Sequence, residues 1–188
     1  MPALSSSPKM TVDQFLKVYE GVEGRYELVD GHVYAMAGGS IAHAFIAGNI
    51  LTLLRRALRG SGCLPFNSDT GLRLSDETLR YPDVAIYCDP RDLELDPNVT
   101  QAFRHPSVVF EVISPSTRIE DRAVKVLEYK AIATVDSIVL VDPVAKTIEV
   151  HERLDVENWL HRLPAAGIDL ALKTPPLTLA HADIFDLS

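Results

Sequence analysis

Two acidic residues interrupt segments of the sequence that are otherwise apolar. Asp83 precedes the run Val-Ala-Ile-Tyr, and Glu111 lies inside a run whose composition predicts a strand buried on both faces. An unpaired buried carboxylate is costly, so proteins retain one where it is paired, hydrogen-bonded or bound to a metal. If the two strands are neighbours, both carboxylates and the backbone carbonyl of Val112 could share a hard cation such as Mg²⁺. Such a metal supports phosphate-ester hydrolysis, because it polarises the phosphodiester and lowers the pKa of a bound water.

Each of these carboxylates also has a structural explanation. Asp83 follows Pro82, where it could cap a turn or accept hydrogen bonds from nearby backbone amides. Glu111 has fewer structural explanations, because a glutamate on a buried strand has to be neutralised. The residues by themselves leave both interpretations open at each position.

The elements that must position these residues are predicted from capping, turn and periodicity signals. Thr11 and Gln14 form a capping box that begins a short helix, and Asp30-Gly31 predicts the tight turn of an N-terminal β-hairpin. We expect helices over 11–20, 41–58 and 119–131, with a further turn or helix near 180–187. Strands are expected at 25–29, 32–37, 63–67, 70–74, 81–88 and 107–113, followed by the apolar segments 137–143, 147–153 and 159–164. The segment 89–106 is predicted to be a surface loop.

Length and composition bound the class of protein. The chain has 188 residues, a formal net charge of −8 and 47% apolar residues, which predicts one α/β (α+β) domain over 11–188 after a loose segment at 1–10. No apolar run approaches the roughly 18 residues of a membrane helix, and the start lacks the apolar stretch of a signal peptide. We therefore expect a soluble, cytoplasmic protein with no membrane partner. Cys63 and Cys88 show no CxxC spacing and are predicted to be reduced core thiols.

An ordered set of motifs resembles a known family. The set comprises Tyr26-Glu27-Leu28-Val29-Asp30-Gly31, the helix bearing His43, Tyr81-Pro82-Asp83-Val84-Ala85, Val108 to Thr117, then Asp121, Lys125, Tyr129 and Val141-Asp142-Pro143. In this order the motifs resemble the Uma-two family of proposed restriction endonucleases, within the PD-(D/E)XK nuclease superfamily. The likeness covers roughly residues 11 to 150. Any one motif alone would be weak.

The resemblance implies a restriction-endonuclease-like core, with a mixed central β-sheet flanked by helices. It implies that Asp83 and Glu111 are metal ligands for Mg²⁺, with Mn²⁺ as a substitute, and that DNA is the substrate. The superfamily usually has a lysine two residues after the glutamate, where this chain has Ile113. The inference is that Lys125 from the following helix takes the place of that lysine. A homodimer is a further implication, because duplex cleavage in this superfamily usually needs two active sites.

Other residues near these motifs have competing explanations. Lys125 lies four residues from both Asp121 and Tyr129, so a surface ion pair would also explain it. Tyr129 shares its helical row with Lys125 and is an additional site candidate. Glu27 is either another acidic ligand or an outward-facing strand residue. His43 could contact a phosphate at a helix N-terminus or help to hold a water, but a lone histidine is more often a hydrogen-bonded packing residue.

Other functional classes are disfavoured. The sequence contains no P-loop, GxGxxG or Gly-x-Ser-x-Gly motif, and the remaining histidines lack a spacing such as HExxH that would indicate a zinc hydrolase. The negative charge argues against broad attraction to nucleic acid; the one basic concentration comprises Arg55, Arg56, Arg59, Arg73 and Arg80. Two alternatives to the endonuclease stay open. One is a catalytically inert nucleic-acid- or protein-binding module, and the other is a metal-dependent hydrolase of another phosphate ester.

Overall fold

The computed structural model describes residues 9–36, 38–114 and 119–187. Most of the segment predicted to be loose, 1–10, lies outside the described residues, as does the stretch 115–118 of the family motif. Among the described residues, no helix has the length and apolar character needed to cross a membrane.

The N-terminal elements follow their local sequence signals. The first helix, α1 (Val12–Tyr19), begins with the predicted capping box, in which Thr11 and Gln14 each accept a hydrogen bond from the other's backbone amide. Strands β1 (Tyr26–Val29) and β2 (His32–Ala35) form the predicted antiparallel hairpin. Asp30 and Gly31 both have positive φ at its turn, which a glycine adopts without strain.

A six-stranded mixed sheet forms the larger layer of the molecule, in the order β11-β10-β9-β8-β6-β3. In chain order its strands are β3 (Leu64–Asn67), β6 (Val84–Tyr87), β8 (Pro106–Val112), β9 (Ser137–Asp142), β10 (Thr147–Arg153) and β11 (Trp159–Arg162). Neighbours are antiparallel except for β8 and β9, which are parallel. That parallel connection is made by α4 (Ile119–Lys130).

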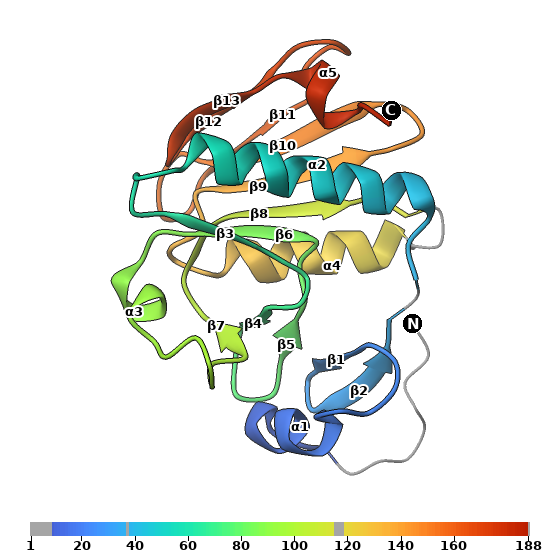
Figure 1. Cartoon of the computed structure of the whole chain (residues 1–188), viewed down its shortest axis with the longest axis vertical. Helices are drawn as coiled ribbons and strands as arrows, with labels where there is room; N and C mark the ends of the chain where they lie inside the picture. The colour runs from blue at the N-terminus through green and yellow to red at the C-terminus, as the bar shows by residue number, and fades with distance from the viewer. Residues whose placement is uncertain (1–8, 37, 115–118, 188) are drawn as a thin grey trace.

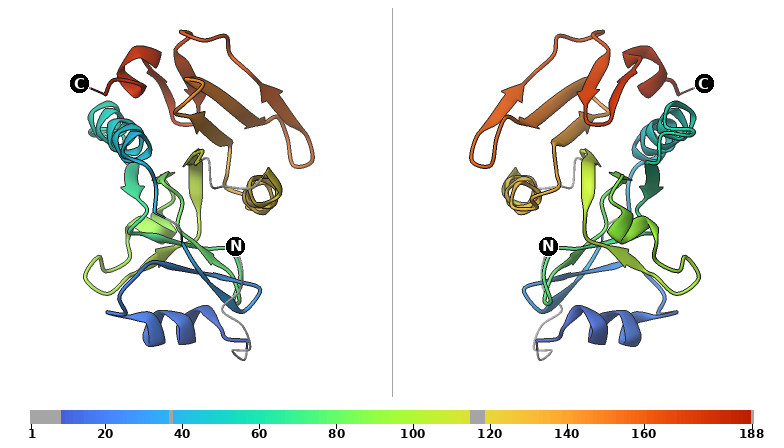
Figure 2. Two further views of the ribbon diagram at one scale, coloured as in Figure 1. Left: turned by 90° about the vertical axis from the view of Figure 1, so that its right-hand side faces the viewer. Right: turned by 90° about the vertical axis from the view of Figure 1, so that its left-hand side faces the viewer.

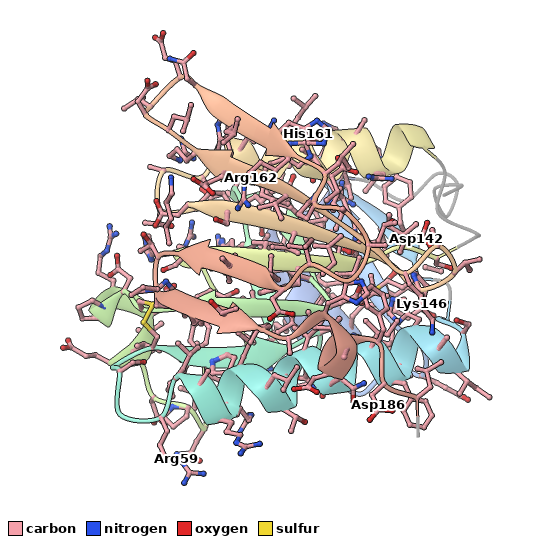
Figure 3. All side chains as sticks on the ribbon, turned by 90° about the horizontal axis from the view of Figure 1, so that it is seen from above. Arg59, Asp142, Lys146, His161, Arg162 and Asp186 are labelled. Carbon is pink, nitrogen blue, oxygen red and sulfur yellow. A yellow bond between two sulfur atoms is a disulfide. The ribbon has the colours of Figure 1, made fainter. Side chains whose placement is uncertain are left out.

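The long helices cover opposite faces of this sheet (Figures 2 and 3). Val108, Phe110 and Val112 of β8 pack with α2 (Ile41–Ala57), whereas the alternate residue Val109 packs with α4. Strand β8 is therefore buried on both faces, as its composition predicts. Because side chains alternate along a strand, Glu111 projects toward α4.

A second, five-stranded sheet lies beside the first, below it in Figure 1. It has the order β2-β1-β5-β4-β7 and includes β4 (Gly71–Arg73), β5 (Leu79–Arg80) and β7 (Ala102–Phe103). A small hairpin of β12 (Leu170–Lys173) and β13 (Pro176–Leu179), followed by α5 (His181–Ile184), packs on the core beside α2. Mixed sheets flanked by helices, with an N-terminal hairpin, confirm the predicted fold class.

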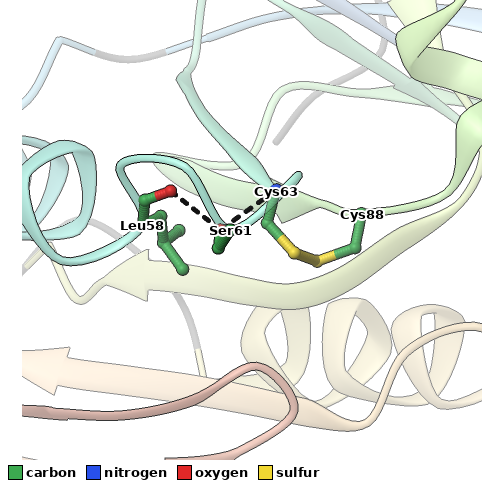
Figure 4. The surroundings of a disulfide bond; sticks show 4 residues. All are labelled: Leu58, Ser61, Cys63 and Cys88. Carbon is green, nitrogen blue, oxygen red and sulfur yellow. Dashed lines mark hydrogen bonds between the residues drawn. A yellow bond between two sulfur atoms is a disulfide. The ribbon is translucent and has the colours of Figure 1, made fainter.

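Two expectations are wrong. Cys63 and Cys88 form a disulfide rather than two thiols (Figure 4). They flank the antiparallel pair β3 and β6, where Leu64 lies opposite Tyr87, so the next pair along the ladder is the two cysteines, with Cα atoms 4.2 Å apart. The 89–106 segment is not simply a surface loop. It contains α3 (Pro90–Leu93) and β7, anchored by the buried Asp92, whose carboxylate accepts hydrogen bonds from the backbone amides of residues 104 and 105.

Candidate active site

Glu111 is held by two side chains of α4. The Lys125 ammonium lies 3.2 Å from Glu111 Oε1, and the Tyr129 hydroxyl donates to the same oxygen at 2.6 Å. Lys125 and Tyr129 are four residues apart, so they share one face of the helix. The predicted proximity of Lys125 to Glu111 is confirmed, and the alternative of Lys125 as a solvent-facing surface residue is wrong, since its side chain is 17% exposed. The side chain of Asp121 lies outside the described residues.

Asp83 lies at the start of β6, beside the end of β8. Its Oδ2 atom accepts a hydrogen bond from the Val112 amide at 2.7 Å and lies 3.2 Å from His43 Nε2. Strands β6 and β8 are adjacent, as the shared-site hypothesis requires, and Val84 pairs with Phe110. Asp83 and Glu111 are therefore the next residues along the two strands, at one end of the sheet.

His43 is positioned by the start of α2. The Ser40 hydroxyl caps this helix by accepting a hydrogen bond from the His43 amide. Gly39 packs against the imidazole so closely that a Cβ atom there would lie 2.7 Å from His43 Nδ1. His43 is thus a hydrogen-bonded residue whose partner is a candidate metal ligand.

Glu27 does not face outward, and it is paired with basic side chains. It is fully buried, and its carboxylate lies 2.9 Å from Arg80 Nη1 and 3.5 Å from Lys125 Nζ. Arg80 also forms a two-pronged pair with Glu128 of α4, at 2.8 and 2.9 Å. Through Arg80, the five-stranded sheet is tied to the helix that carries Lys125.

These side chains border a cavity of about 470 Å³ between the two sheets, the start of α2 and α4. Its lining includes Glu27, His43, Asp83, Glu111, Val112 and Lys125. Tyr129 lies behind Glu111 and reaches the site through its hydroxyl. Every residue that the sequence nominated for the site therefore lies at this cavity or in contact with a residue that lines it.

The environment shifts the proton affinities of several of these groups. Burial raises the pKa of the Glu111 carboxyl, opposed by the Lys125 ammonium. Burial lowers the pKa of Lys125, but Glu111 and Glu27 outweigh that effect and raise it overall. The hydrogen bond to Asp83 raises the pKa of His43, against the opposing effect of burial. The buried carboxylates at the cavity and the Lys125 ammonium thus stabilise each other's charged forms.

The donor set at the cavity fits a hard divalent cation. Two carboxylates from adjacent strands and the Val112 carbonyl are oxygen donors of the kind Mg²⁺ takes. The Lys125 ammonium balances the charge of Glu111, and the His43 imidazole contacts Asp83. The cavity therefore brings oxygen donors and a countercharge together.

Sequence reasoning did not identify every residue near the site. In the sequence, Arg80 belongs to the one basic concentration, but in the structure it is buried and paired with Glu27, and Arg73 pairs with Asp13 and Asp76. Glu128 was not singled out; its position three residues after Lys125 on α4 was the available signal. A cluster of Glu149, His151 and His161 was also missed, because its members meet only through the pairing of β10 and β11.

The chain is similar to known proteins over most of its length. It is 33% identical over 174 residues to "Uncharacterized protein slr1290" of Synechocystis sp. (strain PCC 6803), covering 92% of this chain and 90% of that one. It is 24% identical over 161 residues to "Uncharacterized protein sll1609" of the same organism, covering 85% and 90% of the two chains.

A solved structure shares the fold. It comes from Anabaena variabilis ATCC 29413, is described as "a putative nuclease belonging to DUF820", and superposes with a TM-score of 0.72 at 16% identity, covering 94% of this chain and 97% of that one. A family model described as "Putative restriction endonuclease" matches residues 12–177. With the motif order, the fold and this match in agreement, the chain belongs to the Uma2 (Uma-two) family.

Proposed function

We propose that the protein is a divalent-metal-dependent endonuclease that hydrolyses phosphodiester bonds in DNA. Asp83, Glu111 and the Val112 carbonyl would hold Mg²⁺, with Mn²⁺ as a substitute. The observation that carries the proposal is the Lys125 ammonium, which lies 3.2 Å from Glu111 at the cavity although position 113 is Ile. Lys125 thus supplies from α4 the cation that the superfamily usually places two residues after the glutamate.

The chain's own residues have distinct roles in this proposal. The bound metal would polarise the phosphodiester and lower the pKa of a water. Lys125 would donate hydrogen bonds to the attacking water or to a phosphoryl oxygen as negative charge develops. His43 is a positioning residue for Asp83, and Tyr129 is one for Glu111. Glu27, which is itself paired with Arg80, holds the Lys125 side chain in place from the five-stranded sheet.

Plasmid and linear duplex cleavage with Mg²⁺ or Mn²⁺ tests the proposal. Glu111→Gln should abolish cleavage and retain the fold, because the amide has the same shape without the charge. Lys125→Met should slow cleavage by about a hundred- to a thousandfold, as loss of a preorganised donor does elsewhere. Lys17→Met, on the exposed face of α1, is the matched control and should cleave at the wild-type rate. Wild-type cleavage by Glu111→Gln would remove Glu111 from the mechanism.

Two alternatives make different predictions in the same assays. The inert binding module, favoured by Ile113 and the net charge of −8, predicts no cleavage of any substrate and no thermal shift at millimolar Mg²⁺ or Mn²⁺. A hydrolase of another phosphate ester predicts metal-dependent release of nitrophenolate from bis(p-nitrophenyl) phosphate and no cleavage of DNA. Because cutting both strands requires two such sites, we also propose a homodimer, which light scattering tests.

A further inference from the structure

A second cluster of metal-ligating side chains lies on β10 and β11, on the side of the sheet that carries α4 (Figure 3 labels His161). His151 and His161 are directly opposite each other in the antiparallel ladder, and their rings stack with centroids 4.6 Å apart. Glu149 is two residues before His151, so both point to the same face. Its Oε1 atom lies 2.9 Å from His151 Nε2 and 3.0 Å from His161 Nε2.

The same helix, α4, contacts both this cluster and the cavity. Glu111, Leu140 and Glu149 are paired in one row across β8, β9 and β10. Neighbouring strands are about 4.8 Å apart, so the Cα atoms of the two glutamates are about 10 Å apart across the sheet. Arg122, three residues before Lys125 on α4, forms an ion pair with Glu149 Oε2. None of Glu149, His151 and His161 lines the 470 Å³ cavity, so the cluster is separate from the proposed nuclease site.

We propose that Glu149, His151 and His161 form a second metal site, for a late first-row divalent ion such as Zn²⁺ or Ni²⁺. Two imidazole nitrogens and one carboxylate oxygen converge, with all three donor atoms within 4.8 Å of one another. A metal about 2.1 Å from each donor places neighbouring donors about 3.0 Å apart in an octahedral site and about 3.4 Å apart in the tetrahedral site typical of Zn²⁺. The distances from Glu149 to the two histidines, 2.9 and 3.0 Å, are close to the octahedral spacing. Because the two imidazole rings are stacked nearly parallel, one of them rotates when both nitrogens bind the same ion.

The surroundings favour this ion class over Mg²⁺. Imidazole ligands suit Zn²⁺, Ni²⁺ and Cu²⁺, whereas Mg²⁺ prefers oxygen ligands and retained waters. Arg122 engages Oε2 and leaves Oε1 directed at the histidines, which is how an outer residue orients a ligating carboxylate. His161 is 50% exposed, so an ion has access from solvent and can keep waters in the remaining positions. An occupied site would fasten the edge strand β11 to β10 beneath α4.

Calorimetric titration of tag-free, chelator-treated protein with Ni²⁺ or Zn²⁺ tests the site. We expect wild-type protein to bind an ion that millimolar Mg²⁺ does not displace, with a rise in Tm. His161→Phe keeps the stacked ring but removes the ligand, and Glu149→Gln removes the charge; each should weaken binding at least tenfold. Arg122→Met should weaken it about tenfold, as loss of an outer partner does.

Two controls assign the ion to this cluster. His32→Phe, on the distant hairpin, should leave Ni²⁺ binding unchanged. Glu111→Gln removes a ligand of the proposed nuclease site, so it should at most delete a separate binding event and should leave the event that His161→Phe and Glu149→Gln weaken unchanged. The proposal is overturned if wild-type protein binds neither ion, if His161→Phe and Glu149→Gln bind like wild type, or if Glu111→Gln abolishes binding. Loss of DNA cleavage alone would bear on the proposed function and not on this site.

Discussion

Glu111 and Glu149 lie two strands apart in one row of the six-stranded sheet, and each pairs with a cation of α4, yet their surroundings differ. Glu111 borders a cavity backed by a buried ionic network that runs through Lys125, Glu27 and Arg80. Glu149 lies near the sheet edge, where its partners are an arginine and two imidazoles, one of them half exposed.

This difference shows how one helix over one sheet can support two kinds of polar cluster. In the interior, each charge needs an opposite charge, because burial without a partner is costly. At the edge, the Glu149 carboxylate is as buried as that of Glu111, but its partners Arg122 and His161 reach water. Exposed partners are screened by solvent, so this pairing contributes less to stability. The interior cluster should therefore be sensitive to any loss of balance, and the edge cluster should tolerate it.

The largest expected effect is at Arg80, the centre of the interior network. Arg80→Met leaves the fully buried Glu27 and the partly buried Glu128 without their shared cation. Breaking a buried pair from one side should lower the free energy of unfolding by about 3–5 kcal/mol, measured by urea denaturation. Adding Glu27→Gln should recover part of the lost stability, because it removes one of the two carboxylates that Arg80→Met leaves without their cation. A loss below about 1 kcal/mol in the single variant would contradict the balance argument.

A smaller effect is expected from removing one hydroxyl beside Glu111. Tyr129→Phe deletes the 2.6 Å hydrogen bond to that carboxylate and should cost about 1.5–3 kcal/mol in urea denaturation. Tyr87→Phe is the matched control, since the Tyr87 hydroxyl is equally buried but has no hydrogen-bond partner among the described residues. Its removal should be neutral or stabilising. Equal losses of stability in the two variants would show that the hydrogen bond from Tyr129 to Glu111 does not stabilise the protein.

Two neighbouring glycines test whether the placement of His43 matters. Gly39→Ala puts a Cβ atom 2.7 Å from His43 Nδ1, so the ring must move away from its contact with Asp83. If the proposed function holds, cleavage should fall about ten- to a hundredfold with little change in Tm. Gly38→Ala has open space and should cleave normally. Identical rates for the two variants would leave His43 without a positioning role.

The smallest expected effect is at the sheet edge. Arg122→Met removes the cation that pairs with Glu149, but the Arg122 side chain is 33% exposed. In metal-free protein the free energy of unfolding should fall by less than about 1 kcal/mol. A loss as large as that of Arg80→Met would erase the distinction between the interior and edge clusters.

Much of the fold was predictable because its signals are local. The capping box of Thr11 and Gln14, the positive-φ turn at Asp30-Gly31 and the periodicity of α2 each involve residues close in the chain. The apolar run around Glu111 also predicted a strand covered on both faces, and hence a carboxylate that needed partners. The segment 89–106 was predicted less well, because the buried Asp92 organises it through amides 12 and 13 residues away.

The sequence by itself determined the longer helices and most strands of the six-stranded sheet, the position of Glu111 on a buried strand and the family to which the motif order belongs. The motif order already implied that Lys125 reaches Glu111. Only the tertiary structure decided the other pairings: Lys125 with Glu27, Arg80 with Glu27 and Glu128, and Glu149 with Arg122 and two histidines. It also decided that Cys63 meets Cys88. These pairings depend on strand register and on how a helix lies over a sheet. Both are set by packing between distant segments, and spacing along the chain does not encode them.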